Sequence, residues 1–308
     1  MNGRPDMSVR INKLILRNPV MPAAGTFGYA AEFSRFIDLN QLGAIIVKCI
    51  TLEPRLGSCP HRLAETASGS VCTIGLQNIG VERFIKEKMP FLRTLKPPII
   101  VNIGAQSLED FARLVARLDG VGGIDAFEIN VSCPNVKKGG MQFGTDPEAI
   151  YKVVSTVRQA TDRTLITKLS PNVTDIGLMA KAAVMGGADA VSLINAPLAM
   201  AIDIENRRSR LGRNLTGGLT GPAIKPIAVR MVWQTAQAVN VPIIGVGGIT
   251  SAQDALEFII AGASAIQIGT YNLVDPTTLV KTIAGIESYM LRKQIAGIGD
   301  LIKSLDVS

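Results

Sequence analysis

The sequence contains little of what several large classes of protein depend on. Aromatic residues make up 5% of the 308 residues, and histidine occurs once. Since the basic residues are scattered and few aromatic residues accompany them, we expect no nucleic-acid-binding surface. The four cysteines, Cys49, Cys59, Cys72 and Cys133, show no CxxC spacing. The sequence therefore lacks the pattern of a disulfide framework, a zinc site or an iron–sulfur cluster.

Long hydrophobic runs are equally scarce. No apolar run reaches the roughly 18 residues that a membrane span requires, and residues 1–10 lack the apolar stretch of a signal peptide. We therefore expect a cytoplasmic protein, not bound to a membrane, with reduced thiols. Its net charge of +7, from 32 basic and 25 acidic residues, indicates a mild preference for anionic ligands. The length and the absence of a low-complexity linker predict a single domain over residues 1–308.

The sequence does contain a recurring unit, in which a short apolar run rich in β-forming residues precedes an amphipathic helical pattern. Such runs, alternating with helices, are typical of a parallel sheet covered by helices. Eight of them predict an α/β fold of the (β/α)8 TIM barrel type, although a doubly wound open sheet would give a similar pattern. The predicted strands are residues 19–23, 44–48, 99–103, 126–130, 165–169, 190–194, 242–246 and 265–268, and the predicted helices include 108–118, 147–160, 175–185, 223–239 and 251–261.

Four of the predicted strands follow a turn with a glycine: Gly43, Gly123, Gly187 or Gly262. We expect each of these glycines to end the preceding segment in a left-handed conformation. Two longer segments, residues 51–78 and 196–219, interrupt the repeat after the second and sixth strands. Because the loops that follow barrel strands form the active site, both insertions are expected at the C-terminal face, as lids or walls.

The last two predicted strands end in glycine-containing turns. Gly247 and Gly248 follow strand seven, and Gly269 and Thr270 follow strand eight. Backbone N–H groups in such loops, together with a helix N-terminus, can cradle a phosphate, as they do in many barrels. The same glycines could instead serve only to turn the chain.

Polar side chains occur at the ends of other strands. Lys48 and Lys168 belong to strands two and five, and a lysine in a barrel mouth is costly unless it meets an anion. Asn102, Asn130 and Asn195 lie at the ends of strands three, four and six, and their amides can both donate and accept at the edge of a heterocycle. Each alone could be a snorkelling lysine or a turn-forming asparagine, but together they indicate a binding site.

Cys133 is the sharpest candidate for chemistry. It lies in the string NVSCPN, residues 130–135, directly after the fourth strand, where a proline stiffens a polar loop. A lone cysteine is more often an inert buried side chain, and Cys49 and Cys59 have no such position. His61, the single histidine, falls in the first insertion and is interpreted as a surface or lid residue. Any acid–base work is therefore assigned to Cys133.

With these residues in view, the sequence resembles a known family along nearly its whole length. The strings NPVMPAAGTFGY, IGLQN, NVSCPN, TKLSPN, TGGLTGPAIKP, GVGGI and IGT occur in the order and spacing of class 1 dihydroorotate dehydrogenases. The similarity is greatest to the NAD-linked class 1B enzymes, which have a catalytic cysteine. The resemblance implies an oxidoreductase of pyrimidine biosynthesis, a flavoprotein that binds FMN at the C-terminal mouth of its barrel.

The resemblance also implies roles for individual residues. Cys133 would take the C5 proton of dihydroorotate while the C6 hydride passes to FMN. A free thiol ordinarily has a pKa of about 8.5, so activity is expected to rise toward alkaline pH. The FMN site would comprise Ala24, Lys48, Cys49, Asn102, Asn130, Lys168, Ile194, Gly221, Gly247, Gly248, Gly269 and Thr270. The substrate site would comprise Lys48, Ile74, Gly75, Leu76, Gln77, Asn78, Asn130, Asn195 and Ala196.

A partner subunit is a further implication of the resemblance. In class 1B enzymes an iron–sulfur flavoprotein subunit carries FAD and a 2Fe-2S cluster and passes electrons to NAD. These cofactors are expected on the partner alone, because this sequence has no dinucleotide fingerprint and no cluster-ligand pattern. The expected assembly is a heterotetramer around a homodimer of barrels.

Two residues depart from the substrate motifs of the family. Cys72 stands where an asparagine is usual, and Ala196 stands where a threonine is usual. Both usual residues hydrogen-bond the substrate, and losing such a partner costs about 1–3 kcal/mol for each group. The departures leave open an FMN oxidoreductase of another dihydropyrimidine or related cyclic amide. A barrel that only binds its ligand, or a flavin-free enzyme of sugar phosphates, would also have the glycine loops of the last two strands.

Overall fold

The structure is a computed structural model that describes residues 4–131 and 143–306. At its centre lies a sheet of eight parallel strands in the order β3-β16-β15-β10-β9-β8-β7-β4. These are β3 (Val20–Pro22), β4 (Ile45–Ile50), β7 (Ile99–Ile103), β8 (Ala126–Asn130), β9 (Thr164–Lys168), β10 (Ala190–Leu193), β15 (Ile243–Val246) and β16 (Ala265–Ile268). Each overlaps one of the strands predicted from the sequence, and all eight predictions are confirmed.

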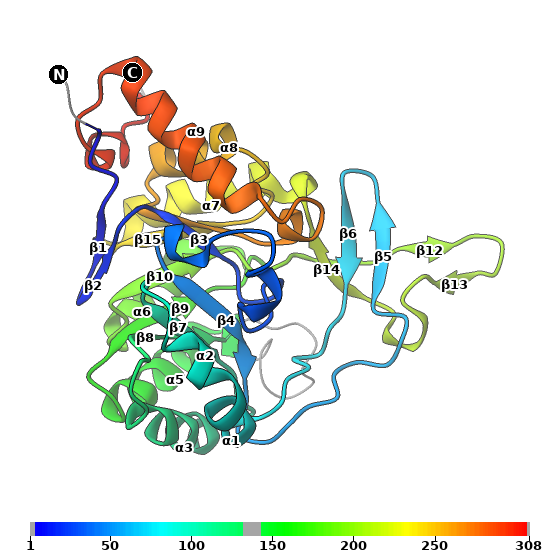
Figure 1. Cartoon of the computed structure of the whole chain (residues 1–308). Helices are drawn as coiled ribbons and strands as arrows, with labels where there is room; N and C mark the ends of the chain where they lie inside the picture. The colour runs from blue at the N-terminus through cyan, green and yellow to red at the C-terminus, as the bar shows by residue number, and fades with distance from the viewer. Residues whose placement is uncertain (1–3, 132–142, 307–308) are drawn as a thin grey trace.

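The first and last strands of this sheet meet each other. The backbone N–H of Gly43, just before β4, donates to the carbonyl of Val20 in β3 at 2.9 Å. Helices surround the strands on the outside (Figure 1), and nearly every strand residue is buried. The predicted (β/α)8 barrel is confirmed, and the alternative of an open doubly wound sheet is wrong.

Four helices around the barrel begin at side-chain caps that the sequence provides. Ser107, Asp146, Asp175 and Ser251 each accept a hydrogen bond from a backbone N–H in the first turn that follows. None of the helices in the described residues is long and apolar enough to cross a membrane. The helices are α1 (Val81–Arg83), α2 (Met89–Leu92), α3 (Leu108–Asp119), α5 (Pro147–Gln159), α6 (Ile176–Met185), α7 (Lys225–Ala238), α8 (Ala252–Ala261) and α9 (Thr278–Lys293).

Three of the four glycine turns have the predicted conformation. Gly123, Gly187 and Gly262 have φ angles of 86°, 102° and 124°, which side chains rarely permit. The prediction is wrong for Gly43, whose φ lies outside that region. A Cβ at Gly43 would lie 2.1 Å from the carbonyl oxygen of Asn18. Gly43 is therefore needed for close backbone approach where the barrel closes, and not for a left-handed turn.

The two insertions together form a second, antiparallel sheet in the order β11-β14-β6-β5. The first insertion contributes β5 (Leu63–Thr66) and β6 (Gly69–Cys72), and the second contributes β11 (Leu198–Ala199) and β14 (Gly217–Thr220). Figure 1 shows this sheet to one side of the barrel, with the hairpin of β12 (Ile202–Asp203) and β13 (Arg208–Ser209) extending beyond it. Because residues of both insertions line the cavity at the C-terminal ends of the strands, their predicted position is confirmed.

A hairpin of β1 (Val9–Ile11) and β2 (Leu14–Leu16) lies at the opposite end of the barrel. The amine of Lys13, in its turn, donates to the carbonyl of Asp162 at 2.7 Å, just before β9 begins. Ile11 and Leu16 are fully buried and belong to the main core. The hairpin therefore covers the N-terminal face and leaves the C-terminal mouth to the insertions.

Candidate functional site

Two adjoining cavities open at the C-terminal mouth of the barrel. The larger has a volume of about 240 Å³ and the smaller a volume of about 130 Å³. Thr26, Lys168, Asn195 and Thr270 line both, so the two form one continuous site. Together they reach the lower end of the size range of cofactor and small-molecule sites.

This site brings together most of the residues that the sequence placed there. Cys133, however, lies outside the residues that the structure describes. The larger cavity is lined by Ala24, Lys48, Cys49, Cys72, Ile74, Gly75, Leu76, Gln77, Asn102 and Asn130. The smaller cavity is lined by Ile194, Gly221, Gly247, Gly248 and Gly269, and Lys168, Asn195, Ala196 and Thr270 face both.

Asn78 is the described residue of the predicted set that lines neither cavity. Its side-chain amide donates to the hydroxyl of Thr51 and to the carbonyl of Leu76, both at 2.8 Å. Its side-chain oxygen accepts from the backbone N–H groups of Thr51 and Gly80. With these bonds Asn78 fixes the loop that carries Ile74 to Gln77 over the mouth.

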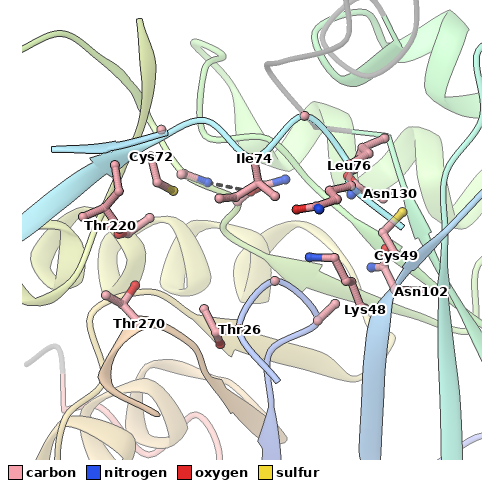
Figure 2. Close-up of a pocket in the computed structure, with 18 of the residues that line it drawn as sticks. Thr26, Lys48, Cys49, Cys72, Ile74, Leu76, Asn102, Asn130, Thr220 and Thr270 are labelled. Carbon is pink, nitrogen blue, oxygen red and sulfur yellow. Dashed lines mark hydrogen bonds between the residues drawn. The ribbon is translucent and has the colours of Figure 1, made fainter. Parts of the chain in front are cut away.

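Lys48 extends from β4 into the larger cavity, and Figure 2 shows its amine directed toward the middle of the site. Burial lowers the pKa of this amine below its usual 10.5, and Cys49 opposes that shift while the nearby charge of Arg62 adds to it. A partly desolvated ammonium group gains most when it meets an anion. Lys48 is therefore suited to bind a carboxylate.

Glycines of several loops form part of the wall of the smaller cavity. Gly247 and Gly248 have φ angles of 129° and 75°, so the loop after β15 adopts a path that other residues would resist. A Cβ added to Gly25, which lines both cavities, would meet no heavy atom within 4 Å. The backbone here is accessible to a ligand, as a phosphate cradle requires.

The N-terminus of α8 is less available to bind a phosphate than its position beside the glycine loops suggests. The carboxylate of Asp254 accepts hydrogen bonds from the backbone N–H and the hydroxyl of Thr250, at 2.9 and 2.7 Å. Asp254 also pairs with the amine of Lys225 at 2.7 Å. Since a carboxylate already occupies the first turn of α8, an anion in the cavity depends mainly on the glycine loops.

The insertions supply a wall of the larger cavity, and several residues of this wall were not predicted from the sequence. Leu63, Ser70 and Thr220 line it alongside Cys72. In Figure 2, Cys72 and Thr220 lie together on one side of the site, and Lys48 and Asn102 lie on the other. Pairing between β6 and β14, which no local sequence pattern specifies, creates this wall.

A buried polar network, which was not predicted from the sequence, lies beneath the site. The carboxylate of Glu128 in β8 accepts hydrogen bonds from Asn102 at 2.5 Å, from Gln267 at 2.6 Å and from Ser192 at 2.8 Å. The amine of Lys168 donates to the side-chain oxygen of Gln267 at 3.1 Å. Polar residues inside otherwise apolar strands were the signal from which such a network could have been predicted. Polar side chains in these positions are buried only when they have hydrogen-bond partners.

The fold and the site define a TIM-barrel enzyme with a cofactor-sized, glycine-lined and partly cationic site at its C-terminal mouth. The dihydroorotate dehydrogenase family matches residues 6–290. The chain belongs to this family, as its motifs predicted.

Relatives described as catalytic subunits of a dihydroorotate dehydrogenase match nearly the whole chain. The "dihydroorotate dehydrogenase B (NAD(+)), catalytic subunit" of Geotalea uraniireducens is 52% identical over 303 residues, which cover 98% of this chain and 99% of that protein. The subunit of the same description from Thermoanaerobacter sp. is 52% identical over 302 residues, covering 98% and 99%. A solved structure of DHODH from Eimeria tenella, in complex with ferulenol, has the same fold with a TM-score of 0.81 and 24% identity, covering 98% of this chain and 89% of that chain.

Proposed function

We propose that this chain is the catalytic subunit of an NAD-linked dihydroorotate dehydrogenase and oxidises dihydroorotate to orotate in pyrimidine biosynthesis. The observation that carries the proposal is the mouth site, where Lys48, Lys168 and three asparagines meet in a chain about half identical to subunits of that description. These relatives favour dihydroorotate over another cyclic amide. They equally favour a catalyst over a barrel that only binds its ligand.

The residues present fit FMN. The side-chain oxygen of Asn102 is buried and has no hydrogen-bond partner among the described residues, so it can accept from a ring N–H of a flavin. Lys168 places a cation beside the same cavity, and the loops with Gly247, Gly248 and Gly269 suit a phosphate. When bound, FMN supplies the acceptor for the hydride of the substrate.

The residues of the larger cavity suit the substrate. Lys48 would bind the carboxylate of dihydroorotate, and the amides of Asn130 and Asn195 would bind the polar edge of its ring. The loop with Ile74 and Leu76 would exclude water from the ring. Cys133, outside the described residues, would remove the C5 proton; this assignment is supported by the NVSCPN motif alone.

The proposal includes a partner. The relatives are described as catalytic subunits of an NAD(+) enzyme, which supports a second, iron–sulfur flavoprotein subunit that holds FAD and a 2Fe-2S cluster. A heterotetramer around a barrel homodimer follows from the family resemblance. The proposal also includes one FMN-binding domain over residues 1–308 and a cytoplasmic location, which the lack of a disulfide pattern supports.

The deciding experiment is an anaerobic titration of the purified chain with dihydroorotate, followed by visible absorbance. We expect a yellow protein whose flavin is reduced stoichiometrically and rapidly. A colourless chain that takes up no FMN would contradict the cofactor, and a yellow chain that dihydroorotate leaves oxidised would contradict the substrate. The variant Cys133→Ser should keep FMN yet be reduced far more slowly, and unchanged reduction would remove Cys133 from the mechanism.

A further inference from the structure

Two charged side chains are buried within the part of the chain that the structure describes, namely Glu128 and Lys168. Lys168 faces both cavities, whereas Glu128 lines neither. A buried carboxylate is costly unless hydrogen bonds and an opposite charge compensate it. The proposed function gives Lys168 a ligand but leaves Glu128 without a role.

The partners of Glu128 come from several strands of the barrel. Asn102 lies beside it on the neighbouring strand β7, and Ser192 lies on β10. Gln267 lies on β16, which does not pair with β8, so the bond between Gln267 and Glu128 crosses the interior of the barrel. Glu128, Ser192 and Gln267 are fully buried. Water therefore cannot replace any of these contacts without entering the core.

The carboxylate determines how the two amides are turned. An ionised carboxylate only accepts hydrogen bonds, so Asn102 and Gln267 must both direct their NH2 groups toward Glu128. The oxygen of Gln267 then faces Lys168 and accepts from its amine at 3.1 Å. Asn102 lines the larger cavity, and its side-chain oxygen has no hydrogen-bond partner among the residues that the structure describes. An amide at position 128 would impose neither orientation.

We propose that Glu128 is a positioning residue, which fixes the amide of Gln267 to hold the amine of Lys168 and fixes the amide of Asn102 to present its oxygen to the ligand. This inference rests on the proposed function, because the ligand beside Lys168 and Asn102 is then FMN. Glu128 itself touches neither cavity and acts only through these two neighbours.

The test uses sulfite as a probe of the cation beside the flavin. Sulfite adds to the oxidised flavin ring and leaves a negative charge on it, so its affinity rises with a well-placed positive charge. FMN affinity of the apoprotein, from quenching of flavin fluorescence, is the second readout. The variants are Glu128→Gln, Lys168→Ala and the double variant. Thr167→Val is the matched control, since Thr167 is fully buried next to Lys168 and its hydroxyl has no hydrogen-bond partner within residues 4–131 and 143–306.

We expect Glu128→Gln to weaken sulfite binding about tenfold, and Lys168→Ala to weaken it at least as much. The double variant should resemble Lys168→Ala alone, because Glu128 acts through Lys168. Thr167→Val should match the wild type in both readouts. Mere removal of a negative charge would have the opposite effect, since it would strengthen sulfite binding whether or not Lys168 is present.

Unchanged or tighter sulfite binding in Glu128→Gln would overturn the inference. So would a double variant whose loss of sulfite affinity equals the product of the losses in the two single variants. If Glu128→Gln does not fold, Gln267→Met tests the same link with the carboxylate retained. It should show the same loss, and wild-type affinity would overturn the inference. A wild-type chain that takes up no FMN would instead refute the proposed function, so the two failures are distinguishable.

Discussion

The hydroxyl groups of Ser70 and Thr220 lie 3.1 Å apart, although 150 positions separate them in the sequence. The Thr220 hydroxyl also lies 3.2 Å from the carbonyl oxygen of Ser70. The two residues belong to β6 and β14, one from each insertion, and both line the larger cavity. The wall of the site therefore depends on how closely the two insertions pack.

Gly69, the residue before Ser70, should tolerate no side chain. A Cβ at Gly69 would lie 2.1 Å from the backbone carbonyl of Thr220, which cannot rotate away. We expect Gly69→Ala to push β14 from β6 and to weaken orotate binding by about tenfold or more, the cost of misplacing about one or two polar contacts. Orotate titration, followed by perturbation of the flavin spectrum, measures this effect.

Gly122→Ala is the control for that substitution, because a Cβ there would meet nothing within 4 Å. It should leave orotate affinity unchanged. Equal affinities of the two variants would show that the wall of the site does not depend on close packing at Gly69.

Lys48→Met should stabilise the protein at neutral pH while abolishing tight orotate binding. Burial lowers the pKa of Lys48, so below that pKa the folded state must hold a desolvated charge. As the pH rises through the lowered pKa toward 10.5, the wild type loses this charge and the advantage of the variant should shrink. In the same interval wild-type affinity for the orotate anion should fall. Thermal unfolding and orotate titration across alkaline pH measure both trends.

The control for Lys48 is Lys181→Met, which removes an exposed amine of α6. It should change neither the unfolding temperature nor orotate affinity appreciably. An unfolding difference between Lys48→Met and wild type that stays constant up to strongly alkaline pH would contradict the role of burial.

Asp275, just before α9, should contribute stability that acid removes. Its carboxylate accepts hydrogen bonds from the amine of Lys281 at 2.7 Å and from the hydroxyl and N–H of Thr277. These bonds lower its pKa from 3.8 to about 2. The folded pKa is the lower one, so the contribution is complete above pH 3.8 and is lost as the pH falls toward 2. Asp275→Asn should thus lower the unfolding temperature slightly at pH 7. Thermal unfolding of both proteins should be followed as the pH is lowered, and their unfolding temperatures should converge near pH 2. A difference that persists at that pH would contradict the stabilising role of the Asp275 carboxylate.

The sequence predicted the barrel well because each strand and its following helix carry their own local signals. β7, β8 and β16 begin and end at the predicted residues, with apolar runs and neighbouring turns that admit few other boundaries. Residues at the ends of these strands were predicted to converge for the same reason, since parallel strands in a barrel end at one face.

Contacts between distant strands could not be predicted in this way. Gln267 meets Lys168 across 99 positions and Glu128 across 139 positions, and no local pattern specifies either pair. Gly43 was expected to turn the chain. It must instead be glycine because the carbonyl oxygen of Asn18, just before β3, leaves no room for a side chain. Only the closed barrel brings these groups together.

Cys72 provides the sharpest test of what the site binds, because it stands where the resemblance implies a substrate-binding asparagine. It ends β6 and lines the larger cavity, and Figure 2 shows it beside Thr220. If the substrate is dihydroorotate, Cys72→Asn should add a hydrogen bond worth about 1 kcal/mol and tighten orotate binding about fivefold.

The exposed Cys59 offers a matched control, and Cys59→Ser should leave affinity for orotate unchanged. Two results together would contradict dihydroorotate as the substrate: an unchanged or weaker affinity of Cys72→Asn for orotate, and reduction of the wild-type flavin by dihydrouracil. They would indicate that Cys72 belongs to a site for another dihydropyrimidine. Measuring both ligands on both variants separates these outcomes, since a general disturbance of the cavity would weaken the two ligands alike.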